Sequence, residues 1–353
     1  MLAELEIYDR HIALIGNWGH QNLWDELILL WNIYILLNKL SNKLDYFDIS
    51  IKPTLYIYSD KVNWLKSFHK YFLFEEKNIN FQYLQELPHG FKSFIKYIFS
   101  GAIREIKNWP KIKTYILGGG EIFTPETPFS YQYRTISLLP FFIWRILWRF
   151  WGQKPRLIVM GGIQQPKRFF DKVCFNLVCK SADAFYLRDK ESVQLIKSIF
   201  PHKKVSLFID SSYFVAESIL LQYDKITKKE KQIAIFNTTP LSSNLPIIIE
   251  KIKEYNTMWY DLYFLPAYFT SHSAQDDMSV YIHIKQKIWD IELKLLDRRD
   301  WNNFINIWKN ADFVYASRLH IYLLARFMGL KIQSFKYQKK LQKMENMLDD
   351  IGL

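Results

Sequence analysis

The chain has 353 residues and a formal net charge of +12, and 49% of its residues are apolar and 17% aromatic. This composition excludes a disordered chain and is sufficient for two domains of ordinary size. The positive charge favours an anionic partner, such as nucleic acid, an anionic membrane surface or a phosphorylated substrate. A lysine-rich composition without functional meaning explains it equally well.

Only two cysteines occur, Cys174 and Cys179, which excludes a disulfide framework. They are five residues apart on a predicted helix, so they point to different faces, and no residues have the ligand spacing of a zinc site. The N-terminal residues are acidic and lack the apolar segment of a signal peptide. These features predict a cytoplasmic protein with reduced thiols.

The first half of the chain alternates short apolar segments with helical ones. Strands are predicted at residues 12–15, 54–58, 114–117, 157–160 and 205–210, and helices at 27–40, 91–107 and on either side of residues 182–189. Glycines follow several strands, for example Gly16 and Gly19, where they allow the backbone to approach a ligand closely. A tight turn between strand and helix is the alternative interpretation. The alternation predicts a parallel, doubly wound sheet.

Residues 138–151 form an unusual segment whose three tryptophans share one helical face and whose two arginines share another. The segment is too short for a membrane span and contains Pro140. Two interpretations remain open. The segment is either an interfacial helix on an anionic membrane surface or an aromatic helix packed on the sheet.

The lysine-rich residues 225–231 separate the two halves and form the predicted linker. The second half repeats the alternation, with strands at 232–236 and 262–266 and a polar loop that contains His272, Asp276 and Asp277. The predicted fold is therefore α/β, with two Rossmann-like domains whose parallel sheets face each other across a cleft, a GT-B-like layout. The predicted parts are an N-terminal domain (1–224), a C-terminal domain (225–340) and a terminal helix that crosses back (341–353).

Residues 310–340 contain the strongest candidate site. A buried strand at 313–315 is followed by Ser317, the predicted N-cap of a helix that ends at Gly329. Arg318 and His320 then lie where a strand ends and a helix begins, the place where parallel sheets bind ligands and where helix N–H groups favour anions. Together with Lys340, these residues suit a small substrate that carries phosphate and carboxylate.

Several stretches, spaced in order over almost the whole chain, resemble the polysaccharide pyruvyl transferase family. They are Gly16, Gly19, Asn22, Asp25 and Glu26; Gly118–Gly120; Gly161–Pro166; Arg188-Asp189-x-x-Ser192; Asp210; Pro266 with the aspartates after it; Ser317–His320; and Tyr337-x-x-Lys340. The chain departs from the family at Gln21 and Trp24, where glycine is usual, and at Gln164-Gln165, which replace Ile-Gly. No arginine follows the strand at 232–236. The first departures lie on the predicted acceptor side and leave the acceptor's identity open.

The resemblance implies transfer of the enolpyruvyl group of phosphoenolpyruvate to a sugar of a cell-surface glycan or its lipid-linked precursor, which forms a pyruvate ketal. Phosphoenolpyruvate would be a co-substrate, and no cofactor or metal is expected. His320 would protonate the enol carbon as the general acid, because a nearby dianion keeps a histidine charged. The remaining roles would fall to Arg318, Lys340, Arg188 and Ser317 as donor-binding residues, and to Gly16, Gly19, Asn22, Asp25, Glu26, Gly119 and Glu121 as acceptor-binding residues.

Structural interpretations of the same residues remain open. His320 can be a capped structural histidine, and Arg188 can pair with Asp189 or Asp183. Two other functions are also open: a GT-B glycosyltransferase that uses a nucleotide sugar, and a non-catalytic glycan-binding protein. No motif supports nucleic-acid binding. The predicted location is the cytoplasm, with attachment to the inner face of the membrane and the oligomeric state left open.

Overall fold

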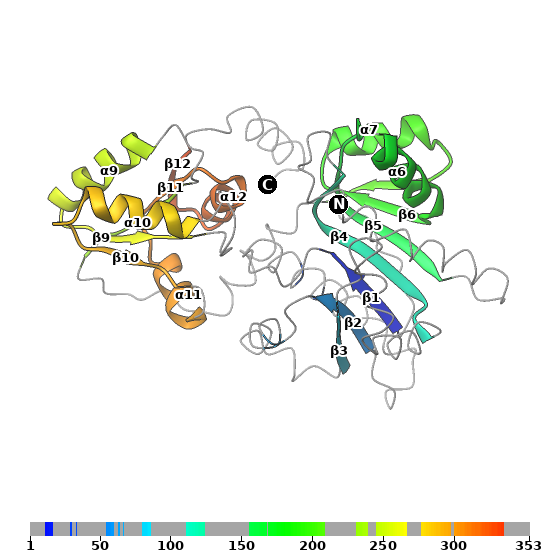
Figure 1. The fold of residues 1–353 in the computed structure, drawn as a ribbon, viewed down its shortest axis with the longest axis horizontal. Coiled ribbons are helices and arrows are strands. Elements are labelled where there is room, and N and C mark those ends of the chain that lie inside the picture. The colour runs from blue at the N-terminus through cyan, green and yellow to red at the C-terminus, as the bar shows by residue number, and fades with distance from the viewer. Residues whose placement is uncertain are drawn as a thin grey trace. The chain divides into compact units, whose positions relative to one another are not determined.

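The structure is a computed structural model that describes residues 11–16, 29, 33, 54–59, 63, 66, 80–85, 111–123, 155–167, 169–208, 231–238, 245–266, 277–297 and 300–334. The chain forms two compact units, one of residues 1–19 and 32–210 and the other of residues 20–31 and 211–353. Each unit contains one parallel sheet (Figure 1). The predicted boundary after residue 224 and residues 225–230 of the predicted linker at 225–231 lie outside the described residues.

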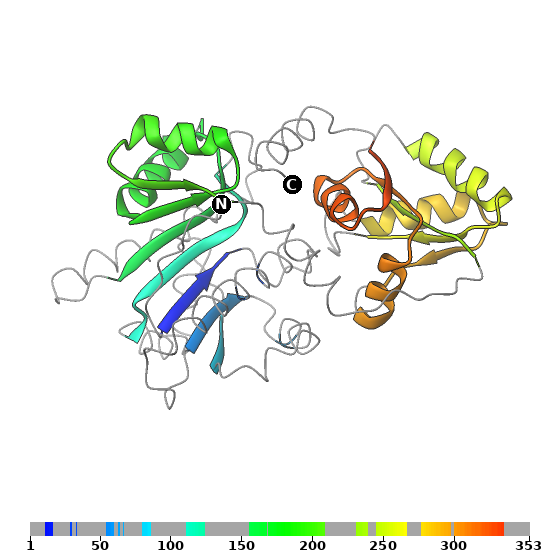
Figure 2. The ribbon, with the colours of Figure 1, turned by 180° about the vertical axis from the view of Figure 1, so that it is seen from behind.

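The first unit is built on a seven-stranded sheet with the order β3-β2-β1-β4-β5-β6-β7. Its strands are β1 (His11–Ile15), β2 (Thr54–Ser59), β3 (Asn80–Gln85), β4 (Thr114–Phe123), β5 (Arg156–Ile163), β6 (Ala184–Leu187) and β7 (Lys204–Leu207). The helices α6 (Phe169–Ser181) and α7 (Lys190–Ile199) lie beside β6 (Figure 2). Phe175 and Val178 of α6 and Ile196 of α7 pack in one buried cluster with residues of β1, β4, β5 and β6.

The second unit is built on a five-stranded sheet with the order β10-β9-β8-β11-β12. Its strands are β8 (Ile233–Asn237), β9 (Asp261–Phe264), β10 (Leu293–Leu295), β11 (Phe313–Ala316) and β12 (Lys331–Ser334). Its helices are α9 (Leu245–Thr257), α10 (Asp277–Lys287), α11 (Trp301–Lys309) and α12 (Leu319–Phe327). Figure 1 shows α9 and α10 together beside the sheet, with α11 on the opposite side.

The core of the second unit follows the alternation of its central strands. Phe236 of β8 pairs in register with Tyr315 of β11, and their rings stack with centroids 5.2 Å apart. Both rings belong to the buried cluster that includes α9 and α10. Ile235 and Val314, which precede Phe236 and Tyr315 in their strands, are also fully buried and, by the two-residue period of a strand, point to the other face. Helices therefore cover both faces, as the sequence predicts for a doubly wound sheet.

The amino ends of the central strands are fixed in the same way in both units. Asp183, just before β6, accepts a hydrogen bond from Leu157 N–H at 2.8 Å and donates its own N–H to Leu157 O at 2.7 Å. Asp312, just before β11, makes the same two contacts with Ile233 of β8, each at 2.8 Å. Each aspartate thereby pins its strand to its neighbour at the edge where the strands begin.

The predicted fold class, α/β with two Rossmann-like parallel sheets, is confirmed. The strands predicted at 12–15, 54–58, 232–236 and 313–315 are β1, β2, β8 and β11 with bounds shifted by at most one residue. Three edge strands, β3, β10 and β12, were not predicted. The helices at 91–107 and 138–151, the terminal segment 341–353 and Asp210 lie outside the described residues. In the helix predicted at 27–40, the described residues Leu29 and Ile33 are helical and fully buried.

Two strands are longer than the sequence predicts, because they continue through glycines that were expected to form turns. The strand β4 runs on through Gly118–Gly120 to Phe123, and its register with β5 shifts between Gly118 and Glu121. The strand β5 includes Gly161, whose φ is +140°, and Gly162. The glycines thus form irregular strand rather than open loop, since a missing side chain tolerates such a bulge.

Candidate functional site

The candidate site lies in the second unit, where the strand order changes direction. The chain winds outward from β8 through β9 to β10, then returns to the other side of β8 with β11 and β12. In open parallel sheets, ligands bind beyond the carboxyl ends of the strands at such a switch point. Asn237, the last residue of β8, pairs with Ala316, the last residue of β11. The next residues, Thr238 and Ser317, therefore leave the sheet at the same level.

Three buried polar side chains at this switch point each carry an oxygen atom that has no hydrogen-bond partner among the described residues. They are Asn237, Thr238 and Ser317, which are at most 2% exposed. The amide of Asn237 donates through Nδ2 to Leu265 O at 2.9 Å, which leaves Oδ1 unsatisfied. The hydroxyl oxygens of Thr238 and Ser317 are unsatisfied as well. Because nearly all buried polar atoms in proteins are paired, this concentration marks unused hydrogen-bonding capacity.

Arg318 stands beside these residues and is held by a buried carboxylate. Its Nη2 and Nε donate to the two carboxylate oxygens of Asp277, at 2.5 and 3.2 Å. Asp277 is 0% exposed and is the first residue of α10, whereas the side chain of Arg318 is 24% exposed. One edge of the guanidinium therefore faces the protein interior, while part of the group remains accessible.

The helix after β11 begins one residue later than the sequence predicts. The N-cap is Arg318, with φ −103° and ψ 132°, rather than Ser317, and the Arg318 side chain makes no capping hydrogen bond. The N–H groups at the start of a helix attract anions where no cap occupies them. The other end is as predicted: Gly329 has φ +68°, and its N–H and that of Leu330 bond to Arg326 O and Ala325 O, a Schellman motif.

The other predicted donor residues are only partly described. His320 is the second residue of α12, directly after Leu319, which places its backbone in the first helical turn. The position of its side chain, like Lys340 and the rest of the Tyr337-x-x-Lys340 motif, lies outside the described part of the chain. The general-acid role of His320 and the donor role of Lys340 therefore remain predictions.

Arg188 follows β6 in the first unit and lies over a glycine. A Cβ added to Gly162 of β5 would lie 2.7 Å from Arg188 Nε and 3.0 Å from Nη2, so only glycine leaves room for this guanidinium. The Arg188 N–H donates to Gly161 O at 3.2 Å, and its Nε is 4.0 Å from Asp189 Oδ2. The predicted pairing with Asp189 is thus present at the limit of an ion pair.

The rest of the Arg188-Asp189-x-x-Ser192 motif is a structural joint. Asp189 is the N-cap of α7, and its side chain accepts from Ser192 N–H at 2.7 Å. The buried Ser192 hydroxyl accepts from Ile163 N–H at 2.9 Å and has Ile163 O at 3.0 Å and Asp189 Oδ2 at 2.9 Å within hydrogen-bond distance. This motif ties the end of β5 to the start of α7.

The predicted acceptor residues that the structure describes, Gly16, Gly119 and Glu121, follow β1 or belong to β4, the strands on either side of the switch point of the first sheet. Ile15 pairs with Leu117, so Gly16 and the glycines of β4 lie at the same level. Gly119 and Glu121 belong to β4, and Glu121 pairs with Gly162 of β5. Their side-chain environment and the remaining predicted acceptor residues, Gly19, Asn22, Asp25 and Glu26, are outside what the structure describes.

In the described ranges, no group of three or more histidine, cysteine, aspartate or glutamate side chains is arranged to hold a metal ion. None of the described helices has both the length and the hydrophobicity that a membrane crossing requires.

Comparison with solved structures defines the class of protein. The UDP-GlcNAc 2-epimerase of Neisseria meningitidis, solved with UDP-GlcNAc bound, superposes with a TM-score of 0.56 at 10% identity, over 92% of this chain and 82% of that one. A putative UDP-N-acetylglucosamine 2-epimerase from Listeria monocytogenes gives 0.57 at 11% identity, over 95% and 82% of the two chains. These similarities and the two parallel sheets define a GT-B-like α/β fold.

Sequence comparison defines the family within that class. The sequence model of the family "Polysaccharide pyruvyl transferase" matches residues 25–329. No curated protein matches the chain. The chain therefore belongs to the polysaccharide pyruvyl transferase family, a family of transferases. The matched region ends at Gly329, so it includes Arg188, Asp277, Arg318 and His320.

The sequence did not identify Asn237, Thr238 and Asp277 as site residues. The sequence showed only that no arginine follows the strand at 232–236, and Asp277 was placed in a polar loop rather than at a buried helix start. The signal that could have found the first two is the position after a buried strand. Nothing local in the sequence shows that the carboxylate of Asp277 reaches Arg318, 41 residues away.

Proposed function

We propose that the protein transfers the enolpyruvyl group of phosphoenolpyruvate to two hydroxyls of one sugar in a glycan, which produces a pyruvate ketal and releases phosphate. The observation that carries the proposal is the fixed guanidinium of Arg318 at the switch point of the second sheet, directly before the start of α12. Membership of the polysaccharide pyruvyl transferase family supports the same reaction and a glycan acceptor.

The donor presents a phosphate and a carboxylate, so its site has to supply several directed cations or N–H groups. An arginine suits either group, because the planar guanidinium matches the spacing of two anionic oxygens. The N–H groups at the start of α12 can bind the second group, since they point along the helix axis and carry its partial positive charge. Lys340 would add a point charge, and Ser317 a hydroxyl donor.

The reaction needs one proton delivered and one leaving group stabilised. A sugar oxygen attacks C2 of phosphoenolpyruvate while C3 takes up a proton and becomes a methyl group. The bond between C2 and the phosphate oxygen then breaks, and the second hydroxyl forms the second C–O bond at C2. The two protons lost from the sugar balance the proton gained at C3 and the proton on the departing phosphate. His320 is our candidate for the acid at C3, because it stands in the first turn of α12.

The acceptor is expected at the switch point of the first sheet, where Gly16 and the glycines of β4 end at one level. Backbone without side chains leaves room there for a bulky sugar. We assign Glu121, Asp25 and Glu26 to hydroxyl binding as hypotheses, with Asn22 beside them. The family name supports a polysaccharide acceptor. A lipid-linked precursor at the inner face of the membrane is the form we would test first.

The first test is thermal unfolding of the native protein with phosphoenolpyruvate, with UDP-N-acetylglucosamine and without ligand. A ligand at about a hundred times its dissociation constant stabilises by roughly 2.7 kcal/mol, which a melting curve resolves. We expect a shift with phosphoenolpyruvate that Arg318→Ala abolishes and that His320→Ala retains, since an acid contributes mainly to the chemical step.

Arg326→Ala is the matched control, because Arg326 lies in the last turn of the same helix. It should leave the phosphoenolpyruvate shift intact. A shift with UDP-N-acetylglucosamine alone would contradict the proposal and favour a nucleotide-sugar enzyme. No shift with either compound would favour a non-catalytic member of the fold.

A further inference from the structure

We propose that Asp277 is a positioning residue of the donor site, whose buried carboxylate orients the Arg318 guanidinium for bidentate contact with an anionic group of the donor. The inference rests on the proposed function, because it concerns the same site. It adds a residue that neither binds the donor nor takes part in the chemistry, and that acts on the donor through Arg318.

The carboxylate of Asp277 is buried. Its side chain is 0% exposed, although it is ionisable and stands at the beginning of α10. Removing a carboxylate from water costs several kcal/mol, and an ion pair rarely regains more than that cost. A buried carboxylate at a sheet edge therefore suggests a purpose other than stability.

The contact between Asp277 and Arg318 is bidentate. Both oxygens of Asp277 are used, one by Nη2 and one by Nε of Arg318, so the carboxylate and the guanidinium lie edge to edge. A guanidinium has five N–H groups in one plane and two edges suited to bidentate contact. Asp277 occupies the edge formed by Nε and Nη2. The edge formed by Nη1 and Nη2 is the one that an oxyanion can approach.

Asp277 and Arg318 follow strands on opposite sides of β8. Asp277 starts the helix that follows β9, and Arg318 follows β11, while β9 and β11 are the two neighbours of β8. The ion pair thus joins segments that follow the two neighbours of β8, and β8 itself ends at Asn237, followed by Thr238, whose side-chain oxygens are unsatisfied among the described residues. Because Asp277 holds the Arg318 guanidinium from the opposite side of β8, the Arg318 side chain cannot rotate freely.

Electrostatics supplies the contrast that makes the proposal testable. A carboxylate close to an anion site repels the anion, so charge alone predicts that Asp277 weakens donor binding. Orientation predicts the reverse, because misplacing the guanidinium loses the paired contact. The two effects change the affinity in opposite directions when Asp277 loses its charge.

The test is a double-mutant cycle with phosphoenolpyruvate titrations by calorimetry on the native protein, Asp277→Asn, Arg318→Lys and the double variant. Asparagine cannot accept from both Nε and Nη2, since its NH₂ group is a donor. We expect Asp277→Asn to weaken binding about tenfold in the native background and by less than about threefold when position 318 is lysine, because residues in one hydrogen-bonded pair are not additive.

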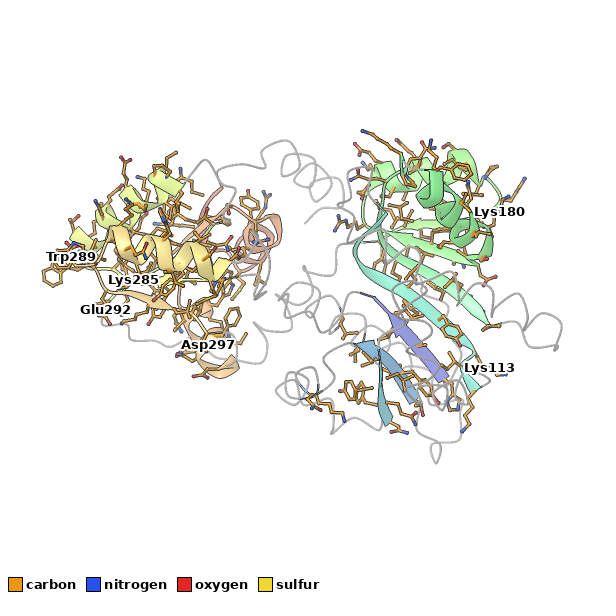
Figure 3. All side chains as sticks on the ribbon, in the orientation of Figure 1. Lys113, Lys180, Lys285, Trp289, Glu292 and Asp297 are labelled. Carbon is orange, nitrogen blue, oxygen red and sulfur yellow. The ribbon has the colours of Figure 1, made fainter. Side chains whose placement is uncertain are left out.

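The control is Asp261→Asn, at the amino end of β9 on the opposite edge of the same sheet. Asp261 Oδ1 pairs with Lys294 Nζ at 3.2 Å, and both side chains are about one-third exposed. Figure 3 marks this end of the unit by Trp289 and Glu292, which precede β10. This variant should leave the affinity for phosphoenolpyruvate unchanged.

Tighter binding by Asp277→Asn would overturn the proposal in favour of simple charge repulsion, and an equal loss in both backgrounds would overturn it in favour of a purely structural role. If Asp277→Asn does not fold, Asp277→Glu keeps the charge but moves the carboxylate by one methylene. Weaker binding would again support orientation, and unchanged binding would overturn it.

Inorganic phosphate is titrated in parallel, so that the two proposals fail in distinguishable ways. A native protein that binds phosphate but not phosphoenolpyruvate contradicts the proposed function. The phosphate cycle then decides the role of Asp277 by the same criterion. A native protein that binds neither compound overturns both proposals.

Discussion

The two sheets resemble each other at the amino ends of their strands and differ at the carboxyl ends. At the amino ends, Asp183 and Asp312 make the same pair of contacts with Leu157, the second residue of β5, and Ile233, the first residue of β8. At the carboxyl ends, the Ser192 hydroxyl of the first unit has three hydrogen-bonding neighbours, whereas the Ser317 hydroxyl of the second has none among the described residues. The shared edge serves the fold, and the unsatisfied edge is available for a ligand.

The two arginines that follow strands show the same contrast. Arg318 is fixed by a fully buried carboxylate in two hydrogen bonds. Arg188 lies over Gly162 and is 4.0 Å from Asp189, whose carboxylate already accepts from Ser192. The Arg318 guanidinium is therefore held by two directed bonds to one carboxylate, and the Arg188 guanidinium fits into the space that Gly162 leaves. An anion site needs the former, because direction decides whether both oxygens are met.

The largest effect is expected from Arg318→Ala. Removing one partner of a buried ion pair typically costs about 3–5 kcal/mol, because the remaining charge stays buried. We expect a loss of this order in the free energy of unfolding, measured by denaturant titration, together with loss of phosphoenolpyruvate binding. Arg188→Ala should cost less, since its neighbour Asp189 is partly exposed.

A second substitution separates stability from binding at this pair. Adding Asp277→Ala to Arg318→Ala removes the uncompensated charge, so part of the lost stability should return while binding remains absent. If the double variant is no more stable than Arg318→Ala, the ion pair is not what makes the single variant unstable.

The next effect compares two serines that each follow or support a strand end. Ser192→Ala leaves Ile163 N–H without its acceptor in a buried position, which costs about 1–3 kcal/mol. Ser317→Ala removes a buried hydroxyl that has no partner in the described part of the chain, so its cost should be near zero, and a small gain is expected. Denaturant titration of both variants checks the difference.

The same pair tests whether the unsatisfied edge binds the donor. We expect Ser317→Ala to weaken phosphoenolpyruvate binding although the protein is no less stable. Equal stability losses for the two serine variants would show that the Ser317 hydroxyl is paired in solution, which would remove the contrast between the two edges.

Gly162→Ala is expected to have a smaller effect on stability and to displace the Arg188 guanidinium. The added Cβ would lie 2.7 Å from Arg188 Nε, and the guanidinium can move away because it ends a flexible side chain. We expect a loss of about 1 kcal/mol or less. If Arg188 contributes to the donor site, the affinity for phosphoenolpyruvate falls more than the stability does. An affinity equal to that of the native protein would assign Arg188 to the fold.

The sequence predicts the second sheet well where strands are short, apolar and followed by a clear stop. The run Phe313–Ala316 is a buried strand, and Gly329 ends the next helix with positive φ, since few other residues adopt that conformation. The edge strand β12 is harder to predict from the sequence, because its residues Lys331–Ser334 are mostly polar and form no apolar run. The three-residue strand β10 gives too short a pattern to distinguish from a loop.

The site is less predictable than the fold because its contacts are not local. Composition and spacing placed Arg318 and His320 at a strand end, and the strand end is where the structure places them. The cap was assigned to Ser317 because serine is a common N-cap, but the buried position of Ser317 beside Thr238 leaves that role to the next residue. The partner of Arg318 comes from another helix, and no periodicity encodes a contact over 41 residues.

The smallest predicted effect tests the amino end of the first sheet, where His11 of β1 faces Tyr56 of β2 with Nδ1 and the hydroxyl oxygen 3.2 Å apart. Burial, followed by the charges of Lys111 and Lys113, lowers the pKa of His11 below its usual value of 6.5. The unfolded chain then binds more protons than the folded one just below pH 6.5, so folding stability rises with pH in that window and its contribution from His11 is complete above it.

We therefore expect the free energy of unfolding to fall between pH 7 and pH 5 by more in the native protein than in His11→Gln, with the curves parallel above about pH 7. The difference should be small, because His11 is only partly buried and solvent screens the two lysines. Lys111→Gln should make the fall in the free energy of unfolding between pH 7 and pH 5 smaller than in the native protein, since one of the charges that oppose protonation of His11 is removed. A steeper pH dependence in His11→Gln would mean that the imidazole is charged in the folded state, and that this edge is held by a cation rather than by a neutral pair.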